Sequence, residues 1–457
     1  MTIHPRAMRR SHLLLAAAVG LAGIAALIGN RTGTPAEVQG APLLPPGADR
    51  PGSAVAAATT SASPGTTPAK PATTAAVAQL VDLDQLTLTA DGDHYEAVLA
   101  DGRHAQLTLD PGLQAYAEKL LVEARAPRGA IVAMAPDGRI LALAGRRGDE
   151  HPPKRGDRSV ASFDWRLATD VWAPAASVFK LVTASALVAA GVDPSDKVCF
   201  HGGIRSVSES NLRDDKHDSR CESLTYGVAH SNNAILGKLA FQKLEPDALT
   251  RLARELGVAD VLPGSELLGV AGAMELPTAH DLSFAQAAAG FVGSRLSAMG
   301  GALLAATFAD DGEQPVPRII ASIDGVAQVG PARRRAVTAE IAKAVGKMMT
   351  ATCEIGSAAR SFGKHQTIRV AGKTGTLTRT EPFYMEHSWF VGYAPVEQPQ
   401  IVVSVVLGNP ENWHLRGHEA ARRLIDRALR PATGPGGPGG HAKDHGAKVT
   451  SARRAGW

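Results

Sequence analysis

The segment APAASVFKLVTASALVAAG, residues 173–191, decides the fold of this chain. It is apolar almost throughout, with Pro174 just upstream of its helical part and Gly191 as a stop, which predicts a buried helix. Ser177 and Lys180 lie three residues apart at the helix start, so their side chains share one face. A serine hydroxyl attacks only when a base takes its proton, and a desolvated lysine can be that base. The segment therefore predicts a serine nucleophile activated by a lysine.

This S-x-x-K pattern is short, and the chain contains a second copy in SFGK, from Ser361 to Lys364. The second copy includes a glycine and has no apolar helix behind it. We expect it to lie in a loop and to carry no chemistry.

A second signal lies in AHSNNAILGKLA, residues 229–240, where Ser231 and Asn233 form an S-x-N pair that leads into a helix. A hydroxyl can relay a proton, and a carboxamide can orient an amide substrate. Taken alone, the pair is also explained as a helix cap.

A third signal is RVAGKTGT, residues 369–376, a predicted strand that contains Lys373, Thr374, Gly375 and Thr376. A lysine and threonine hydroxyls offer charge-assisted hydrogen bonds to a carboxylate. A glycine lets an extended peptide approach the strand closely. A solvated lysine on a strand is the structural explanation, but the three motifs in this order indicate one site.

The order S-x-x-K, S-x-N, K-T-G resembles the motif set of penicillin-binding proteins and serine β-lactamases. LTLDPGLQAYAEKLL (107–121) and GAIVAMAPDGRILALAG (129–145) are also similar to the start of the transpeptidase domain in bifunctional penicillin-binding proteins. The resemblance covers roughly residues 107–429. It implies that Ser177 is acylated by a peptide ending in D-Ala-D-Ala, with Lys180 as general base.

The resemblance implies roles for the other motif residues as well. Ser231 passes a proton to the leaving D-Ala, and Asn233 holds the substrate amide. The backbone N–H groups of Ser177 and Thr376 form the oxyanion hole. The residues that bind the substrate's terminal carboxylate region are Lys373, Thr374, Gly375 and Thr376.

The expected fold class is α/β (α+β), with an antiparallel sheet of about five strands flanked by helices and an inserted all-helical lobe. Hairpins are predicted at 129–145 and 388–408, because two apolar runs flank a turn in each. Helices are predicted at 111–125, after the capping residue Asp110, and at 416–429. These elements lie at both ends of the body, which indicates one sheet assembled from distant segments.

The N-terminal part has the composition of a membrane-targeting segment and a spacer. Arg9 and Arg10 precede LLLAAAVGLAGIAALI (13–28), an apolar run about as long as one membrane crossing needs. We expect a retained anchor, or else a cleaved signal, in the inner membrane, with the catalytic body in the periplasm. The expected division is a cytoplasmic basic segment (1–11), the anchor or signal (12–29), a Pro/Ala/Thr-rich linker (30–76), a small β element (77–106), the transpeptidase domain (107–430) and a flexible basic tail (431–457).

Composition excludes several classes of protein. The net charge of +4 is small, and part of its excess sits at the chain ends, so no nucleic-acid partner is expected. No metal-ligand spacing such as H-E-x-x-H occurs, and we expect neither metal nor cofactor. There are only three cysteines, so this is not a disulfide scaffold. Cys199 and Cys221 either pair or remain free thiols, like Cys353.

The expected function is a peptidoglycan D,D-transpeptidase that penicillins inhibit covalently. Three alternatives remain: a D,D-carboxypeptidase, a serine β-lactamase, and a non-catalytic sensor of β-lactams or wall. A β-lactamase must activate water efficiently, and Glu266 in SELLGV lacks the E-x-x-L-N context of the class A enzymes. The expected partners are stem peptides, β-lactams, the inner membrane and a separate glycosyltransferase.

Overall fold

The computed structural model describes residues 80–148, 161–203, 205–264, 266–363, 367–381 and 383–429. The predictions for 1–11, 12–29, 30–76 and 431–457 concern residues outside these ranges, as does Lys364 of the second S-x-x-K copy. Within the described ranges, no helix is both long and apolar enough to cross a membrane.

The central element is a six-stranded antiparallel sheet in the order β16-β17-β18-β4-β5-β6. One half of the sheet, β16-β17-β18, comes from the C-terminal part of the chain and the other half, β4-β5-β6, from the N-terminal part, and the halves meet where Val405 of β18 pairs with Ile131 of β4. The predicted antiparallel sheet and both predicted hairpins are confirmed. The strands are β4 (Arg128–Met134), β5 (Ile140–Arg147), the two-residue edge strand β6 (Ser162–Phe163), β16 (Ala371–Arg379), β17 (Met385–Ala394) and β18 (Ile401–Asn409).

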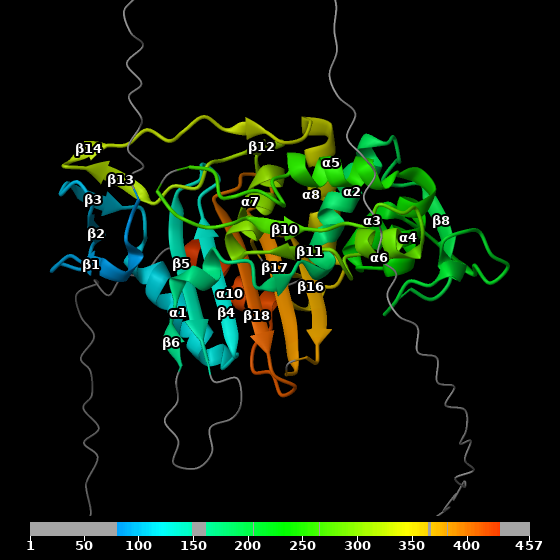
Figure 1. Ribbon diagram of the computed structural model, residues 1–457, viewed down its shortest axis with the longest axis horizontal. Coiled ribbons are helices and arrows are strands. Elements are labelled where there is room, and N and C mark those ends of the chain that lie inside the picture. The colour runs from blue at the N-terminus through cyan, green and yellow to red at the C-terminus, as the bar shows by residue number, and fades with distance from the viewer. Residues whose placement is uncertain are drawn as a thin grey trace, which may run out of the picture. The chain divides into compact units, whose positions relative to one another are not determined.

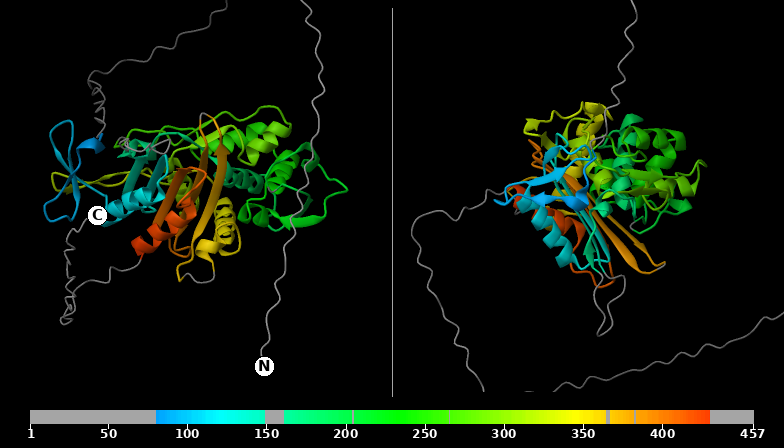
Figure 2. Two further views of the ribbon diagram at one scale, coloured as in Figure 1. Left: turned by 90° about the horizontal axis from the view of Figure 1, so that it is seen from below. Right: turned by 60° about the vertical axis from the view of Figure 1, so that its left-hand side comes forward.

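Helices cover both faces of this sheet, which explains why β18 is buried along its whole length and mostly apolar. Ile131 faces the helices α1 (Pro111–Ala124) and α10 (Gly417–Leu429), whereas its neighbour Val132 faces the opposite core with α7 (Ala298–Ala309). Figure 2 shows α1 and α10 side by side on one face. The predicted cap of α1 is present, because the Asp110 carboxylate accepts the Leu113 N–H at 2.7 Å.

A largely helical lobe lies beside the sheet (Figure 1). Its helices are η3 (Ala176–Phe179), α2 (Lys180–Ala189), η4 (Glu209–Asn211), α3 (Leu224–Ala229), α4 (Asn233–Lys243), α5 (Pro246–Glu255) and α6 (Leu282–Ala288), with α8 (Ala339–Glu354) and α9 (Ala359–Phe362) nearer to β16. The lobe is not all-helical as predicted. It also contains the short strands β7 (Ala173–Pro174), β8 (Lys197–Phe200), β9 (Arg220–Ser223), β10 (Gly272–Met274) and β11 (Ser294–Leu296). Strands this short leave little period-two pattern in the sequence.

The predicted small β element pairs with a distant part of the chain. A five-stranded sheet has the order β1-β2-β3-β13-β14 and comprises β1 (Thr87–Leu88), β2 (Tyr95–Val98), β3 (His104–Leu107), β13 (Ile320–Ile323) and β14 (Val326–Ala327). The remaining short elements are η1 (Leu83–Gln85), η2 (Trp165–Ala168), β12 (Glu313–Gln314) and β15 (Arg334–Arg335). Glu266 contacts the start of β13, because its carboxylate accepts hydrogen bonds from the backbone N–H groups of Ile319 and Ile320 at 2.5 and 2.9 Å.

Candidate functional site

The site is centred on the start of the long apolar helical segment. Ser177 lies in the 3-10 turn η3, and Lys180 begins α2 directly after it. The Nζ atom of Lys180 lies 2.8 Å from the Oγ atom of Ser177. Ser177 is half-buried, whereas Lys180 is fully buried. The structure thus brings together the two residues that the three-residue spacing predicts to meet.

Two carbonyl oxygens complete the surroundings of the Lys180 amine. Its Nζ atom donates to Asn233 Oδ1 at 2.8 Å and to the backbone carbonyl of Ala289 at 2.6 Å. Burial, and then the positive charge of Lys373, hold the pKa of Lys180 well below its usual value of 10.5. A neutral amine has two N–H donors and one lone pair. The two carbonyls can accept both N–H groups, which leaves the lone pair for the hydroxyl of Ser177.

Ser231 and Asn233 lie at the junction of α3 and α4. The cap of α4 is their neighbour Asn232, whose Oδ1 atom accepts the N–H of Ile235 at 3.0 Å. Ser231 has a left-handed backbone conformation (φ +55°), which turns the chain between the two helices. Asn232, and not Ser231 or Asn233, is therefore the residue that caps α4. The side chain of Asn233 instead accepts a hydrogen bond from Lys180.

Lys373 of β16 connects the sheet to the S-x-N segment. Its Nζ atom donates to the Ser231 hydroxyl at 3.1 Å and to the carbonyl of Thr374 at 2.9 Å. The side chain is fully buried, and this desolvation lowers the pKa of Lys373 to about 7. Lys180 thus joins Ser177 to Asn233, and Lys373 joins the K-T-G strand to Ser231, so the motif residues meet as amines, hydroxyls and a carboxamide.

The remaining residues of the K-T-G strand lie along one edge of the sheet. Gly375 is tightly packed, since a Cβ atom there would lie 3.1 Å from Trp389 Cβ and 3.3 Å from Val178 Cγ2. Thr376 is exposed, and Thr374 is half-buried. A side chain at position 375 would press against Trp389 and Val178, so a glycine suits the close contact between β16 and the start of the Ser177 helix.

Several contributors to the site were missed at the sequence level. The carbonyl of Ala289 carries no sequence signal, because any residue type supplies one. Ser357 was also missed; its Oγ atom lies 2.6 Å from Thr374 Oγ1. The expectation of a loop for Ser361 was wrong, since it lies in the single-turn helix α9. The question of Cys199 and Cys221 is resolved: they form a disulfide.

Gly290 packs directly against the backbone of the nucleophile segment. It has φ +87°, and a Cβ atom there would lie 2.1 Å from the carbonyl oxygen of Ala176. Gly290→Ala is expected to lower the free energy of unfolding by about 2–5 kcal/mol, the sum of backbone strain and steric overlap. The matched control is Gly191→Ala, where φ is +85° but no atom lies within 4 Å, so it should lose only about 1–2 kcal/mol. Equal losses in denaturant titrations would contradict this account of Gly290.

The sequence of the chain is similar to a protein family and to individual known proteins. Residues 129–427 match the family model described as penicillin binding protein transpeptidase domain. The peptidoglycan D,D-transpeptidase PbpA of Mycobacterium tuberculosis is 26% identical over 339 residues, which is 68% of each chain. PbpA of Mycolicibacterium smegmatis is 24% identical over 313 residues, covering 61% of this chain and 62% of that protein.

Solved structures with the same fold come from the same group of proteins. Penicillin-binding protein A of M. tuberculosis, solved as a ceftriaxone acyl-enzyme, has a TM-score of 0.59 and 21% identity, covering 72% of this chain and 80% of that one. Penicillin-binding protein 3 of M. tuberculosis, solved with aztreonam, also has a TM-score of 0.59 and 21% identity, covering 77% and 88%. These likenesses show a common fold.

Proposed function

The chain belongs to the penicillin binding protein transpeptidase family, and from this premise we propose that it is a peptidoglycan D,D-transpeptidase with Ser177 as nucleophile. The observation that carries the assignment of the nucleophile is the 2.8 Å contact between Ser177 Oγ and the buried Nζ atom of Lys180. The PbpA relatives named as D,D-transpeptidases support the same reaction. Penicillins acylate the same hydroxyl in this proposal.

The acylation step follows from the contacts of Lys180. Its lone pair takes the Ser177 proton while Oγ attacks the carbonyl carbon of the penultimate D-Ala. The oxyanion that forms is stabilised by the backbone N–H groups of Ser177 and Thr376. When the C–N bond breaks, the Ser231 hydroxyl passes a proton to the departing amine, and the neighbouring Lys373 is placed to replace that proton. The result is an acyl-Ser177 ester and free D-Ala.

Substrate binding is assigned to the edge of the sheet. An extended stem peptide lies along β16, where exposed strand backbone is available for pairing. The terminal carboxylate is bound at Lys373, Thr374 and Thr376, with Gly375 giving access to the backbone. Asn233 donates from its amide nitrogen to the substrate carbonyl while its Oδ1 atom stays on Lys180. The remaining acyl chain runs toward Arg379, which lines a cavity of about 240 Å³ with Pro174 and Phe291.

The second half-reaction distinguishes the candidates within this fold. An amine from a neighbouring stem peptide releases the acyl group as a cross-link, and water releases it as a carboxypeptidase product. A β-lactamase would in addition hydrolyse acylated penicillin quickly. Glu266 is the carboxylate considered for activating water in that reaction. Its carboxylate accepts hydrogen bonds from the backbone N–H groups of Ile319 and Ile320 instead. This arrangement favours a transpeptidase over a class A β-lactamase.

The test of the proposed function uses a donor peptide ending in D-Ala-D-Ala together with an excess of an amine acceptor, a D-amino acid. We expect mass spectrometry to find mainly the product in which the acceptor replaces the terminal D-Ala. Release of D-Ala with only the hydrolysed donor would contradict transpeptidation and support a carboxypeptidase.

We also propose that the enzyme is held at the inner membrane by residues 12–29 and acts in the periplasm beside a separate glycosyltransferase. The support is the apolar run after Arg9 and Arg10 and the Pro/Ala/Thr-rich segment that follows it.

A further inference from the structure

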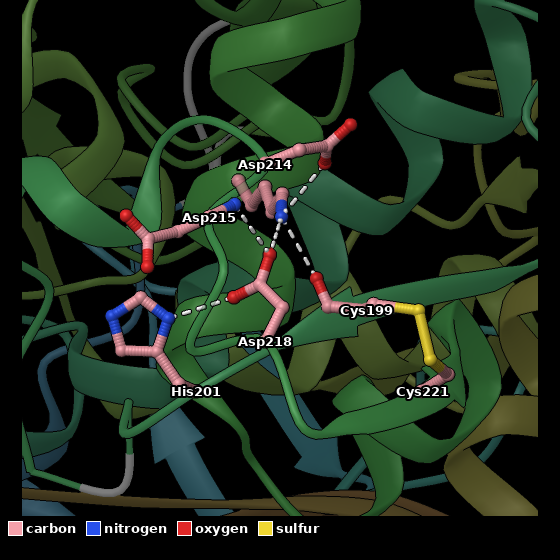
Figure 3. The surroundings of a disulfide bond; sticks show 7 residues. Cys199, His201, Asp214, Asp215, Asp218 and Cys221 are labelled. Carbon is pink, nitrogen blue, oxygen red and sulfur yellow. Dashed lines mark hydrogen bonds and ion pairs between the residues drawn. A yellow bond between two sulfur atoms is a disulfide. The ribbon is translucent and has the colours of Figure 1, made fainter.

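The segment between Cys199 and Cys221 lies along α4, the helix that begins with Asn233. Cys199 and Cys221 face each other in the β8–β9 pairing and are joined by a disulfide, so the residues between them form a closed loop. Figure 3 shows this loop with Asp214, Asp215 and Asp218 gathered near the bonded cysteines. We call residues 199–221 the disulfide loop.

The disulfide loop contacts the first turn of α4 directly. The carbonyl of Gly203 accepts the N–H of Asn233 at 2.9 Å. Gly203 has φ +76°, and a Cβ atom there would lie 2.1 Å from Ala234 Cβ. One turn further along, Val207 Cγ1 lies 3.0 Å from where a Cβ atom of Gly237 would stand. The loop therefore follows one face of the helix with no room between them.

Lys238, on the same face of α4, binds the disulfide loop through ion pairs and hydrogen bonds. Its side chain is fully buried and donates to Asp218 Oδ2 at 2.6 Å and to the Cys199 carbonyl at 2.8 Å, with an ion pair to Asp214 at 2.9 Å. Figure 3 labels these three partners. His201 Nδ1 lies 2.7 Å from the other oxygen of Asp218. Burial disfavours both charges, but the hydrogen bond and mutual attraction outweigh it, so the pKa of Asp218 falls to about 2 and that of Lys238 rises.

We infer that Lys238 is a positioning residue for the S-x-N segment, and that it acts together with the Cys199–Cys221 disulfide. The disulfide restricts the loop, the loop holds α4 at Asn233 and Lys238, and this keeps Asn233 Oδ1 on the amine of Lys180. A displacement of about 1 Å at a catalytic contact can cost about 100-fold in rate. The inference rests on the proposed acylation of Ser177, because that is the reaction the contact serves.

The test measures the second-order rate constant for acylation of the full chain by benzylpenicillin. Two variants release the loop: Cys199→Ser with Cys221→Ser, and Lys238→Met. Each is expected to slow acylation about 10- to 100-fold. Each is then combined with Asn233→Ala. If the loop acts through Asn233, releasing it in the Asn233→Ala background should slow acylation by less than about threefold, because the contact is already lost.

Two controls separate positioning from general loss of stability. Leu424→Ala removes a buried side chain from α10, outside the lobe, and should lower the melting temperature without a comparable loss of acylation rate. Should Lys238→Met fail to fold because Asp218 is left buried and charged, Lys238→Met with Asp218→Leu removes both charges. The same kinetic loss is expected from that pair.

Either of two results would overturn the inference: acylation at the wild-type rate after release of the loop, or the same slowing with and without Asn233. A wild-type chain that benzylpenicillin does not acylate at all would overturn the proposed function first, and the inference with it.

Discussion

Ser177→Ala is expected to abolish covalent labelling by penicillin, with acylation falling by more than about 1,000-fold. The Oγ atom is the atom that forms the ester, and no other hydroxyl in the S-x-x-K, S-x-N and K-T-G motifs contacts Lys180 in the described structure. Ser231 contacts Lys373 instead. Removing one half-buried hydroxyl should leave the fold intact. Labelling is measured with a fluorescent penicillin after denaturing electrophoresis.

The control for this prediction is the second S-x-x-K copy. Ser361→Ala removes a serine from the same four-residue pattern, but from α9, where no apolar helix of the Ser177 kind follows. It should label like the wild type. Labelling that survives Ser177→Ala would exclude Ser177 as nucleophile.

Lys180→Met is expected to slow acylation by about 100- to 10,000-fold, the usual range for losing a general base. Methionine fills a similar volume but has no proton acceptor for Ser177. It also leaves the carbonyls of Asn233 and Ala289 without the amine, so the free energy of unfolding should fall by about 1–3 kcal/mol. Stopped-flow or quenched labelling gives the rate, and denaturant titration gives the stability.

The pH dependence of acylation is the sharper readout for Lys180. The wild-type rate should fall as pH decreases through the pKa of Lys180, because the protonated amine has no lone pair. Burial and Lys373 lower that pKa well below 10.5, so at any given pH a larger fraction of the amine is neutral than in an exposed lysine. Lys180→Met should lose this acid limb along with most of its rate. A variant that kept both the rate and the limb would show that another group is the base.

The sheet could be predicted because its strands carry strong local signals. β18 is apolar except at Ser404 and Asn409, and the Pro136-Asp137-Gly138 turn separates β4 from β5. Asp110 and Pro111 likewise mark the start of α1. The pairing of β3 with β13 had no such signal, because the two strands lie more than 200 residues apart and β13 has only four residues.

The site was predictable as far as side chains carry its chemistry. The three motifs name Ser177, Lys180 and Asn233, whose polar atoms are linked by hydrogen bonds, and Lys373, whose amine is bonded to Ser231. The contacts of the Ala289 and Gly203 carbonyls could not be predicted, because every residue type has a backbone carbonyl and the sequence does not show which of them will be used. The disulfide was left open for another reason: a pair of cysteines 22 residues apart is compatible with bonded or free thiols until their positions are known.

The central claim is tested most directly by intact-mass spectrometry of the purified full-length chain incubated with benzylpenicillin and followed over hours. The account predicts a stable adduct with the mass of one penicillin, mapped by peptide digestion to the segment that contains Ser177. An unmodified protein, whether the drug is consumed or left intact, would contradict it: rapid consumption would indicate a β-lactamase, and no consumption a protein that binds without catalysis.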